Sequence, residues 1–270
     1  MVSLARLWWR WIPYFGFHHV LMAFSYISII FISIIAAGCT TTGLKDIYLI
    51  SLSYTANNTT NVPDRASGQV STIIPSIFTS TTIKNSSLEV RVAYFGLCLQ
   101  RLGGQWICSS AEDLASSEID AKSSSPEGGG DPLNLIYLAE KFRKEVVFVG
   151  LLFTSLALAI ISIFILRTYP SWFLDYDSDS VSDIGRTLPG PTTMSSIVTA
   201  FMSLATMLAF VAILWQHLGG TVAATMYTTT TYGAVAAHIG VTATALGWVT
   251  VFAQSLTLVG ISVIRLTRVL

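Results

Sequence analysis

The sequence predicts a membrane protein, an all-α bundle of four transmembrane helices with a β-rich, disulfide-containing first extracellular loop. The first observation is composition: hydrophobic residues make up 52% of the 270-residue chain and charged residues only 11%, whereas soluble proteins carry about 25% charge. The second is that four stretches of at least 21 residues contain no Asp, Glu, Lys or Arg. The third is that nine of the fifteen Lys and Arg and eleven of the fifteen Asp and Glu lie between residues 38 and 145.

The chain begins with a predicted cytoplasmic segment, residues 1–16, and a first transmembrane helix, residues 17–37. Arginines stand among tryptophans in the first segment, a pattern typical of the cytoplasmic membrane interface. The uncharged residues that follow span about 31 Å as a helix, which matches the hydrocarbon core of a bilayer. A cleaved signal peptide is the alternative, because small residues occur at 36–38, but its apolar region is usually only about 7–15 residues long. A bacterial lipoprotein cleavage site at Cys39 is a second alternative, although the usual Leu three positions earlier is missing.

The large hydrophilic block, residues 38–145, is predicted to be an extracellular loop rich in strands. β-Branched and aromatic residues at 47–54 and strict alternation at 88–94 indicate two strands. Residues 109–132 are rich in Ser, Gly and acidic residues and predict a mobile loop, and residues 133–145 regain a helical pattern. Three glycosylation sequons place the block in the secretory lumen or outside the cell. They begin at Asn57, Asn58 and Asn85.

Two cysteines of this block, Cys98 and Cys108, are predicted to form a disulfide across a hairpin. A Gly-Gly pair between them predicts the turn. A turn centred on Gly103 places Cys98 opposite Cys108, as a cross-strand disulfide requires, whereas a two-residue Gly-Gly turn would place Cys98 opposite Ser109. Two unpaired cysteines in a loop are the alternative. With the disulfide formed, Cys39 is left over, and we expect it to be a packed thiol.

Three further transmembrane helices are predicted from the uncharged stretches 146–166, 195–215 and 240–264. They leave a cytoplasmic loop at 167–194, a short extracellular loop at 216–239 and a cytoplasmic C-terminus at 265–270. Small residues recur four positions apart in these stretches, which allows close helix packing, although alanine-rich sequence also gives this spacing by chance. No span contains an acid or a base, which argues against a charged ion path through one chain. Gln254, the one amide near the middle of a span, is interpreted as an interhelical contact.

Both termini are predicted to be cytoplasmic, because the basic residues of the short segments lie on one side of the membrane. The segments on the side of the N-terminus contain Arg6, Arg10, Arg167, Arg186, Arg265 and Arg268. The segment 216–239, on the other side, contains no Lys or Arg. Basic residues at 141–144 conflict with this orientation locally, but the rule discounts loops longer than about 60 residues.

Patterns that would point to catalysis or metal binding are incomplete. Alternating aspartates at 175–179 suggest an EF-hand, but Ser180 and Arg186 stand where that loop needs Gly and Glu, so a solvated acidic turn is the preferred interpretation. His217 and His238 flank a short segment and are interpreted as interfacial residues instead of metal ligands. We therefore predict no enzymatic activity, no metal and no cofactor. The formal net charge of zero gives no reason to expect a nucleic-acid partner.

The segment from Ala93 to Cys108 carries a resemblance to a known family. A four-span chain with a β-rich first loop and Gly-Leu-Cys followed by a second cysteine resembles the claudin-like tetraspan superfamily. Within it the chain is similar to a fungal family, the pheromone-induced regulators of calcium influx and cell fusion in mating, whose signature is Gly, two hydrophobic residues, Gly, any residue, Cys and a later Cys. The matching residues are Ala93, Tyr94, Phe95, Gly96, Leu97, Cys98 and Cys108, with Ala93 standing where the family has its first glycine.

This resemblance implies a multi-pass plasma-membrane glycoprotein that regulates low-affinity calcium influx and assists membrane fusion during fungal mating. The protein is expected to lie in the lipid bilayer and to have a calcium channel or the fusion machinery as its partner. It is also expected to form a homo-oligomer. The residues alone predict less, a non-enzymatic extracellular fold clamped by a disulfide on a four-helix base. The alternative function is that of a structural, claudin-like tetraspan that organises membrane domains and mediates lateral or cell-cell contacts.

Overall fold

The computed structural model of the protein describes residues 17–55, 88–101, 104–110, 131–168 and 191–269. The chain divides into two compact units, which are described in turn. The first, the helical unit, consists of Met1–Ile32, Gly150–Ala212 and Trp248–Leu270. The second, the sheet unit, consists of Ser33–Val149 and Ile213–Gly247.

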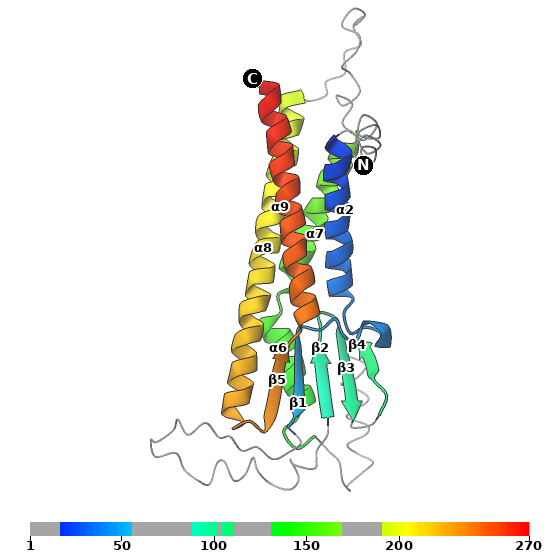
Figure 1. Cartoon of the computed structure of the whole chain (residues 1–270), viewed down its shortest axis with the longest axis vertical. Coiled ribbons are helices and arrows are strands. Elements are labelled where there is room, and N and C mark those ends of the chain that lie inside the picture. The colour runs from blue at the N-terminus through cyan, green and yellow to red at the C-terminus, as the bar shows by residue number, and fades with distance from the viewer. Residues whose placement is uncertain (1–16, 56–87, 102–103, 111–130, 169–190, 270) are drawn as a thin grey trace, which may run out of the picture. The chain divides into compact units, whose positions relative to one another are not determined.

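Four helices of the described chain are long and apolar enough to cross a membrane, as the sequence predicts. They are α2 (Phe17–Ala36), α7 (Val149–Thr168), α8 (Pro191–Thr230) and α9 (Val241–Val269). In the helical unit, α2 and α8 run in one direction and α7 and α9 in the other (Figure 1). The protein is therefore a multi-pass membrane protein with four helices as its membrane-spanning part.

The helices of the helical unit pack through small and apolar side chains. Ser155 and Ala159 of α7 and Ala205 and Ala209 of α8, two pairs with the predicted four-residue spacing, are all buried. The Ser155 hydroxyl donates a hydrogen bond to the carbonyl oxygen of Ala205 at 2.8 Å, so α7 and α8 approach closely there. One end of the unit is closed by an apolar cluster. It contains Leu21, Leu166, Val198, Met202 and Ile261, at least one residue from each helix.

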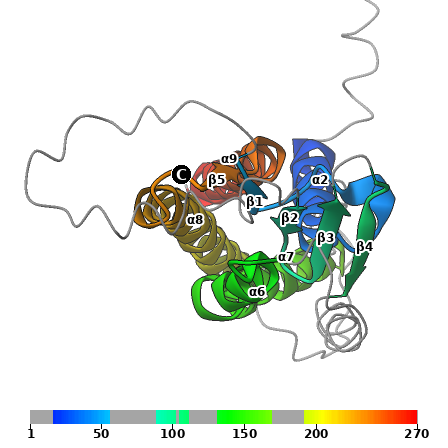
Figure 2. The ribbon, with the colours of Figure 1, turned by 90° about the horizontal axis from the view of Figure 1, so that it is seen from below.

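The sheet unit contains a five-stranded antiparallel sheet with the strand order β4-β3-β2-β1-β5 (Figure 2). Its strands are β1 (Ile50–Tyr54), β2 (Leu88–Val92), β3 (Gly96–Arg101), β4 (Ile107–Ser110) and β5 (Val235–Ile239). The segments predicted as strands at 47–54 and 88–94 contain β1 and β2. A short 3-10 helix, η1 (Thr42–Leu44), lies between α2 and β1.

One face of the sheet is an apolar core covered by helix α6 (Leu135–Val146), which lies within the helical segment predicted at 133–145 except for its last residue. The register places Ile50 opposite Val92 and Leu52 opposite Val90, and all four side chains are fully buried. The α6 residues turned inward are Leu135, Ile136, Ala139 and Phe142. This face therefore holds the hydrophobic residues of the strand alternation, and the polar positions fall on the opposite face.

Tyr54, at the end of β1, fixes the start of α6. Its hydroxyl donates a hydrogen bond to Oδ1 of Asp131 and accepts one from the backbone N–H of Leu133. The other carboxylate oxygen of Asp131 accepts the N–H of Ile136 at 3.0 Å, in the first turn of the helix. Burial and the bond to Asp131 raise the pKa of the Tyr54 hydroxyl, so it remains a donor at every physiological pH.

The segment 216–239, expected from sequence to be a short extracellular loop, is structured in a different way. Helix α8 continues through it to Thr230, and β5 follows and pairs with β1. The threonines of this segment are tolerated in the helix, since their hydroxyls bond carbonyl oxygens four residues back along it. It ends where Gly233 adopts a φ of +78° and its N–H bonds the carbonyl oxygen of Thr228 at 2.9 Å.

Several sequence-based predictions lie outside the described residues. These are the cytoplasmic segment 1–16, the sequons at Asn57, Asn58 and Asn85, most of the predicted mobile loop at 109–132 and the acidic turn at 175–186. They remain predictions.

Candidate functional site

The disulfide predicted between Cys98 and Cys108 is present and joins the neighbouring strands β3 and β4. The register places Cys98 directly opposite Cys108 and Leu97 opposite Ser109. This is the pairing expected for a turn centred on Gly103 and not for a two-residue Gly-Gly turn. Because β4 is only four residues long and lies at the edge of the sheet, the covalent bond holds a strand that has few other contacts.

The first part of the motif is a tight turn between β2 and β3. The sequence suggests one strand running to Tyr94, but β2 ends at Val92, and the N–H of Ala93 bonds the carbonyl oxygen of Gly96 at 2.9 Å. Tyr94 and Phe95 are thus the two residues at the tip, with Tyr94 buried and Phe95 40% exposed. Alternation alone misses this turn because the tip residues are themselves apolar and continue the pattern by type.

Gly96 is required by a backbone crossing. A Cβ atom placed on Gly96 would overlap the backbone carbon and oxygen of Cys39 and lie 2.6 Å from the nitrogen of Thr40. The start of β3 therefore lies directly on the chain that leaves α2, with no space for a side chain between them.

Ala93, which replaces the first glycine of the family signature, also lies against this chain. It is 1% exposed, and a Cβ added to Gly38 would lie 3.2 Å from its methyl group. The methyl group of Ala93 is accommodated because residue 38 has no side chain. The pair Gly38 and Ala93 thus provides the close packing that the motif position requires.

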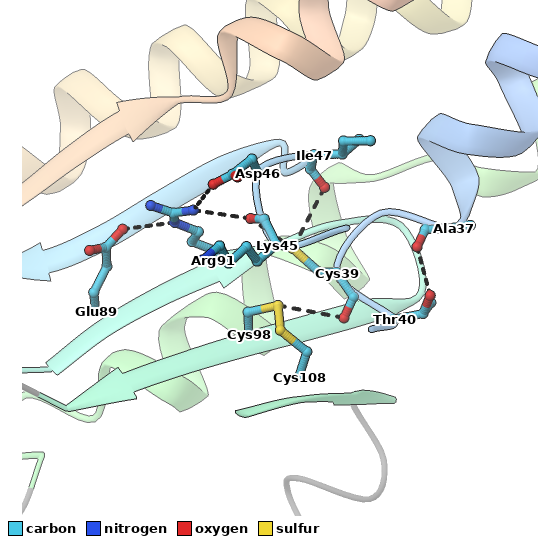
Figure 3. Close-up of a disulfide and its surroundings, with 10 residues drawn as sticks. All are labelled: Ala37, Cys39, Thr40, Lys45, Asp46, Ile47, Glu89, Arg91, Cys98 and Cys108. Atoms are coloured by element: carbon cyan, nitrogen blue, oxygen red, sulfur yellow. Dashed lines mark hydrogen bonds and ion pairs between the residues drawn. A yellow bond between two sulfur atoms is a disulfide. The ribbon is translucent and has the colours of Figure 1, made fainter. Parts of the chain in front are cut away.

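Cys39 lies at the centre of the contact between the segment that follows α2 and the motif residues 93–98. It is fully buried, adopts a φ of +54°, and forms an apolar cluster with Ala93 and Cys98. Its thiol donates to the carbonyl oxygen of Ile47 at 3.6 Å, and the disulfide sulfur of Cys98 lies 3.7 Å from the Cys39 carbonyl oxygen (Figure 3). Burial raises the pKa of the Cys39 thiol to about 12, so the group is a packed thiol and a poor nucleophile.

The polar face of the sheet is dominated by one cation, Arg91 of β2. Its guanidinium lies 4.8 Å from the ring centre of Tyr48 and 4.2 Å from that of Trp106. Nη1 bonds Oδ1 of Asp46 at 2.7 Å, and Nε bonds Oε1 of Glu89 at 2.9 Å (Figure 3). Arg91 is therefore held by two rings and two carboxylates.

Arg91 links the strands to the segment that follows α2. Nη1 also donates to the carbonyl oxygen of Lys45 at 3.1 Å, and Arg91 pairs in register with Cys98. Burial acts to lower the pKa of the guanidinium, but the hydrogen bonds to Glu89 and Asp46 outweigh it and the pKa is raised. The charge on Arg91 is therefore permanent and is neutralised locally, so it is a structural clamp and offers little attraction to distant anions.

We expect Arg91→Lys to loosen this clamp. Lysine keeps the charge but loses the planar group that stacks between two rings and bonds two carboxylates, so the free energy of unfolding should fall by about 1–3 kcal/mol. Thermal unfolding of the full chain in lipid nanodiscs measures the loss. The matched control is Lys141→Ala, whose 3.9 Å ion pair with Glu145 is exposed on both sides and should change stability by less than about 0.5 kcal/mol. Equal effects of the two substitutions would contradict the structural role of Arg91.

Tyr94 connects the motif to helix α8. Its hydroxyl donates a hydrogen bond to Oε1 of Gln216 at 2.7 Å, and burial raises the pKa of this hydroxyl. Close by in sequence, the indole N–H of Trp215 bonds the carbonyl oxygen of Val146, and the ring meets Phe148 edge to face. Residues 213–220 thus contact both the motif and the end of α6, and no local sequence pattern predicts these contacts.

The histidines and acidic residues form no metal centre among the described residues. His238 lies on the edge strand β5 opposite Ser51 and is exposed, and His217 belongs to α8. Nδ1 of His217 is buried and has no hydrogen-bond partner among the described residues. The interpretation of both histidines as interfacial residues stays a prediction.

The motif and the disulfide are predictable from the sequence, but the surroundings of Arg91 are not. The alternation of apolar and polar residues along β2 places Arg91 on the face opposite Val90. Nothing in the sequence indicates that the rings of Tyr48 and Trp106 lie against the guanidinium of Arg91. The proximity depends on the path of residues 39–48 across the sheet. The one available signal is that Glu89 and Arg91 are opposite charges on the same face of a strand whose other residues are uncharged.

A comparison with protein-family models matches residues 76–267, more than two thirds of the chain, to the family described as "Ca2+ regulator and membrane fusion protein Fig1". The matched region contains strands β2 to β5, the disulfide, α6 and three of the four membrane-spanning helices. No curated protein matches the chain. The description names a regulator and fusion protein and not an enzyme. From the match, the four apolar helices and the disulfide-bearing sheet, we conclude that the chain belongs to the Ca2+ regulator and membrane fusion protein Fig1 family.

Proposed function

We propose that this protein lies in the plasma membrane of a fungal cell and regulates low-affinity calcium influx and membrane fusion during mating. It acts without catalysis, through contacts of the sheet unit with a calcium channel or with the fusion machinery. The observation that supports this most strongly is the family match across the motif, the disulfide and three membrane-spanning helices. Mating, the plasma membrane and the identity of the partner come from the resemblance of the motif residues 93–98 and 108.

The proposed orientation places the sheet unit outside the cell and both termini in the cytoplasm. A disulfide persists in an oxidising compartment, which supports an extracellular position for Cys98 and Cys108. The three sequons at Asn57, Asn58 and Asn85 belong to the same connection between α2 and α6. The arginines of the short segments support a cytoplasmic side for the termini.

Glycosidase treatment tests this orientation. If the sheet unit is extracellular, the protein isolated from cells should lose mass on treatment, because oligosaccharides attach only in the secretory lumen. The matched control carries Asn→Gln substitutions at 57, 58 and 85 and should show no shift. An unchanged mass of the native protein, together with labelling of Cys98 by a thiol reagent in surface protein, would overturn the orientation.

The motif region exposes two apolar side chains to which a partner can bind. Phe95 is 40% exposed and Ile107 is 63% exposed, while Tyr94, the residue before Phe95, is buried. Rigid exposed aromatic and aliphatic side chains bind partners at low entropic cost, and such residues dominate the affinity of many interfaces. We propose that the tip of the β2–β3 turn and strand β4 contact the partner.

Calcium uptake during mating tests the function. Cells that lack the protein should take up less calcium than cells that express it, and Phe95→Ser should reduce uptake without reducing surface delivery, since this side chain is exposed. The control is Tyr137→Ser, which alters a more exposed aromatic residue on α6, at 64% exposure, outside the motif. Uptake that is the same with and without the protein would reject the calcium role.

The second candidate is a structural tetraspan that organises membrane domains or joins neighbouring cells. It is supported by the arrangement of a disulfide-clamped sheet unit with four helices whose described spans contain no acidic residue. Under this alternative, calcium uptake would be unaffected by loss of the protein, while its own clustering in the membrane would change with Phe95→Ser. A homo-oligomer is part of this proposal.

A further inference from the structure

The second half of helix α8, in the sheet unit, carries an exposed apolar face. Leu218, Val222 and Met226 are 52%, 63% and 59% exposed. They stand four residues apart and therefore share one face of the helix, which we call the outer face of α8. The threonines beside them add no free donor, because Thr221 and Thr225 donate their hydroxyl protons to carbonyl oxygens of the same helix.

Most of this face lies beyond the hydrocarbon core of the bilayer. Helix α8 has 40 residues, which makes it about 60 Å long, twice the thickness of the core. A Cβ atom on Gly219 would lie 2.8 Å from Cγ1 of Val146, so α8 passes the end of α6 at this residue. Helix α7 begins three residues after Val146, at Val149, and runs in the direction opposite to α8 (Figure 1). Val222 and Met226 therefore lie past the start of this neighbouring span.

Charges on α6 mark the water side of this boundary. The side chains of Lys144 and Glu145, next to Val146, are 65% and 64% exposed. Charged groups with this exposure are costly in hydrocarbon, so lipid chains do not cover the outer face of α8 at this level. Helix α6 thus turns charges outward, as a helix in water does, whereas residues 216–239 contain no Asp, Glu, Lys or Arg. The outer face of α8 has the composition of a face that is covered by protein.

The absence of charge on the outer face selects the partner. A surface with charged groups would lose their hydration here without gaining an opposite charge, so the partner surface is itself uncharged and apolar. The same face of a second copy meets this condition. Two copies in one membrane hold α8 in the same direction and at the same height, so each outer face can meet its own counterpart. Because the bilayer already orients both copies, less rotational freedom is lost on pairing than between two soluble proteins.

We propose that the outer face of α8 is the interface through which two copies of the chain associate. The pairing is parallel, with a two-fold axis along the membrane normal, so Val222, the middle residue of the row, lies opposite the same residue of the second copy. Rows of side chains four residues apart pack into the grooves of a facing helix in this way. The inference rests on the homo-oligomer named in the proposed function and gives it a surface, and it does not depend on the calcium role.

Crosslinking of the full chain in lipid vesicles tests the proposal. Val222→Cys is treated with a short bismaleimide at a low ratio of protein to lipid, and we expect most of the protein to become a covalent dimer. The native cysteines do not interfere, because Cys98 and Cys108 form a disulfide and Cys39 is buried. The matched control is Tyr137→Cys, which places a thiol on the exposed side of α6. Equal yields of dimer from the two variants would overturn the proposal.

Charge substitutions identify a second copy as the partner. Val222→Lys and Val222→Glu each place like charges opposite one another, so each variant alone should be monomeric by single-molecule photobleaching, where the native protein should bleach in two steps. A mixture of the two variants should regain two-step bleaching, because opposite charges then face each other. Tyr137→Lys should bleach in two steps like the native protein. A mixture that stays monomeric would contradict the two-fold pairing.

The two measurements separate this surface from the oligomer itself. Two-step bleaching of the native protein without crosslinking through Val222→Cys would show that the copies associate elsewhere, which rejects the interface on α8 and keeps the homo-oligomer. One-step bleaching of the native protein would reject both. Calcium uptake is measured separately in cells, so neither result decides the calcium role.

Discussion

Gly96→Ala is expected to prevent the sheet unit from folding correctly and to reduce delivery of the protein to the cell surface to a small fraction of the native level. The added methyl group would overlap backbone atoms of Cys39, and backbone cannot rotate away as a flexible side chain can. Overpacking of this kind costs about 1–3 kcal/mol when side chains absorb it, and we expect at least the upper value here. Surface labelling of the full chain in intact cells measures the effect.

The matched control for this substitution is Gly43→Ala in the same unit. A Cβ atom at Gly43 would meet only Oγ1 of Thr41, at 4.0 Å, and alanine is favoured over glycine in a short helix such as η1. Surface delivery of Gly43→Ala should equal that of the native protein. Equal delivery of both variants would show that β3 does not lie against residues 39–40, which would remove the basis for the site described above.

Loss of the disulfide is the second large expected effect. Cys98→Ser removes a bond that closes a loop of ten residues, and the chain-entropy relation gives about 3 kcal/mol for such a loop. The single variant also leaves Cys108 as a free thiol on the edge strand. We therefore expect Cys98→Ser to lower the midpoint of thermal unfolding clearly and to reduce surface delivery, with the double variant Cys98→Ser and Cys108→Ser less impaired in delivery because no unpaired thiol remains.

Thiol labelling can follow the disulfide between Cys98 and Cys108, because the third cysteine, Cys39, should not react. Its thiol is buried and its pKa is raised to about 12, so a maleimide at neutral pH should not label the native protein at all. In Cys98→Ser, labelling should appear at Cys108. Native surface protein in which both Cys98 and Cys108 are labelled would refute the disulfide, and normal unfolding and delivery of Cys98→Ser would show that the bond is dispensable.

Local sequence identified those features that depend on composition and short spacing. Uncharged stretches of helix-spanning length identify the four membrane helices, since burial in lipid forces every backbone group into a helix and excludes charge. The spacing of Cys98 and Cys108 around Gly103 predicts the register of β3 and β4, because an antiparallel hairpin has a single axis of pairing.

Other features depended on contacts between distant segments. Helix α8 extends to Thr230, and strand β5, which follows it, pairs with β1, whose residues lie more than 180 positions earlier in the chain. The hydrogen-bond partners that make β5 a strand therefore belong to β1 and cannot be found in the local sequence of β5. The turn at Tyr94 and Phe95 was hidden because both tip residues continue the apolar pattern of the strand. Tyr94 is buried, and its hydroxyl bonds Gln216 of α8, a residue 122 positions away.

By itself, the sequence determined that the chain is a four-span membrane protein with a disulfide-linked hairpin and a family motif, because lipid, covalent chemistry and short-range pairing act on neighbouring residues. Only the tertiary structure decided what the motif positions do. Gly96 and Ala93 are small because the backbone at Gly38 to Thr40 crosses them, and Arg91 is neutralised because Tyr48, Trp106 and Asp46 surround it. Those neighbours are set by the path of residues 39–48 over the sheet, and no local periodicity encodes such a path.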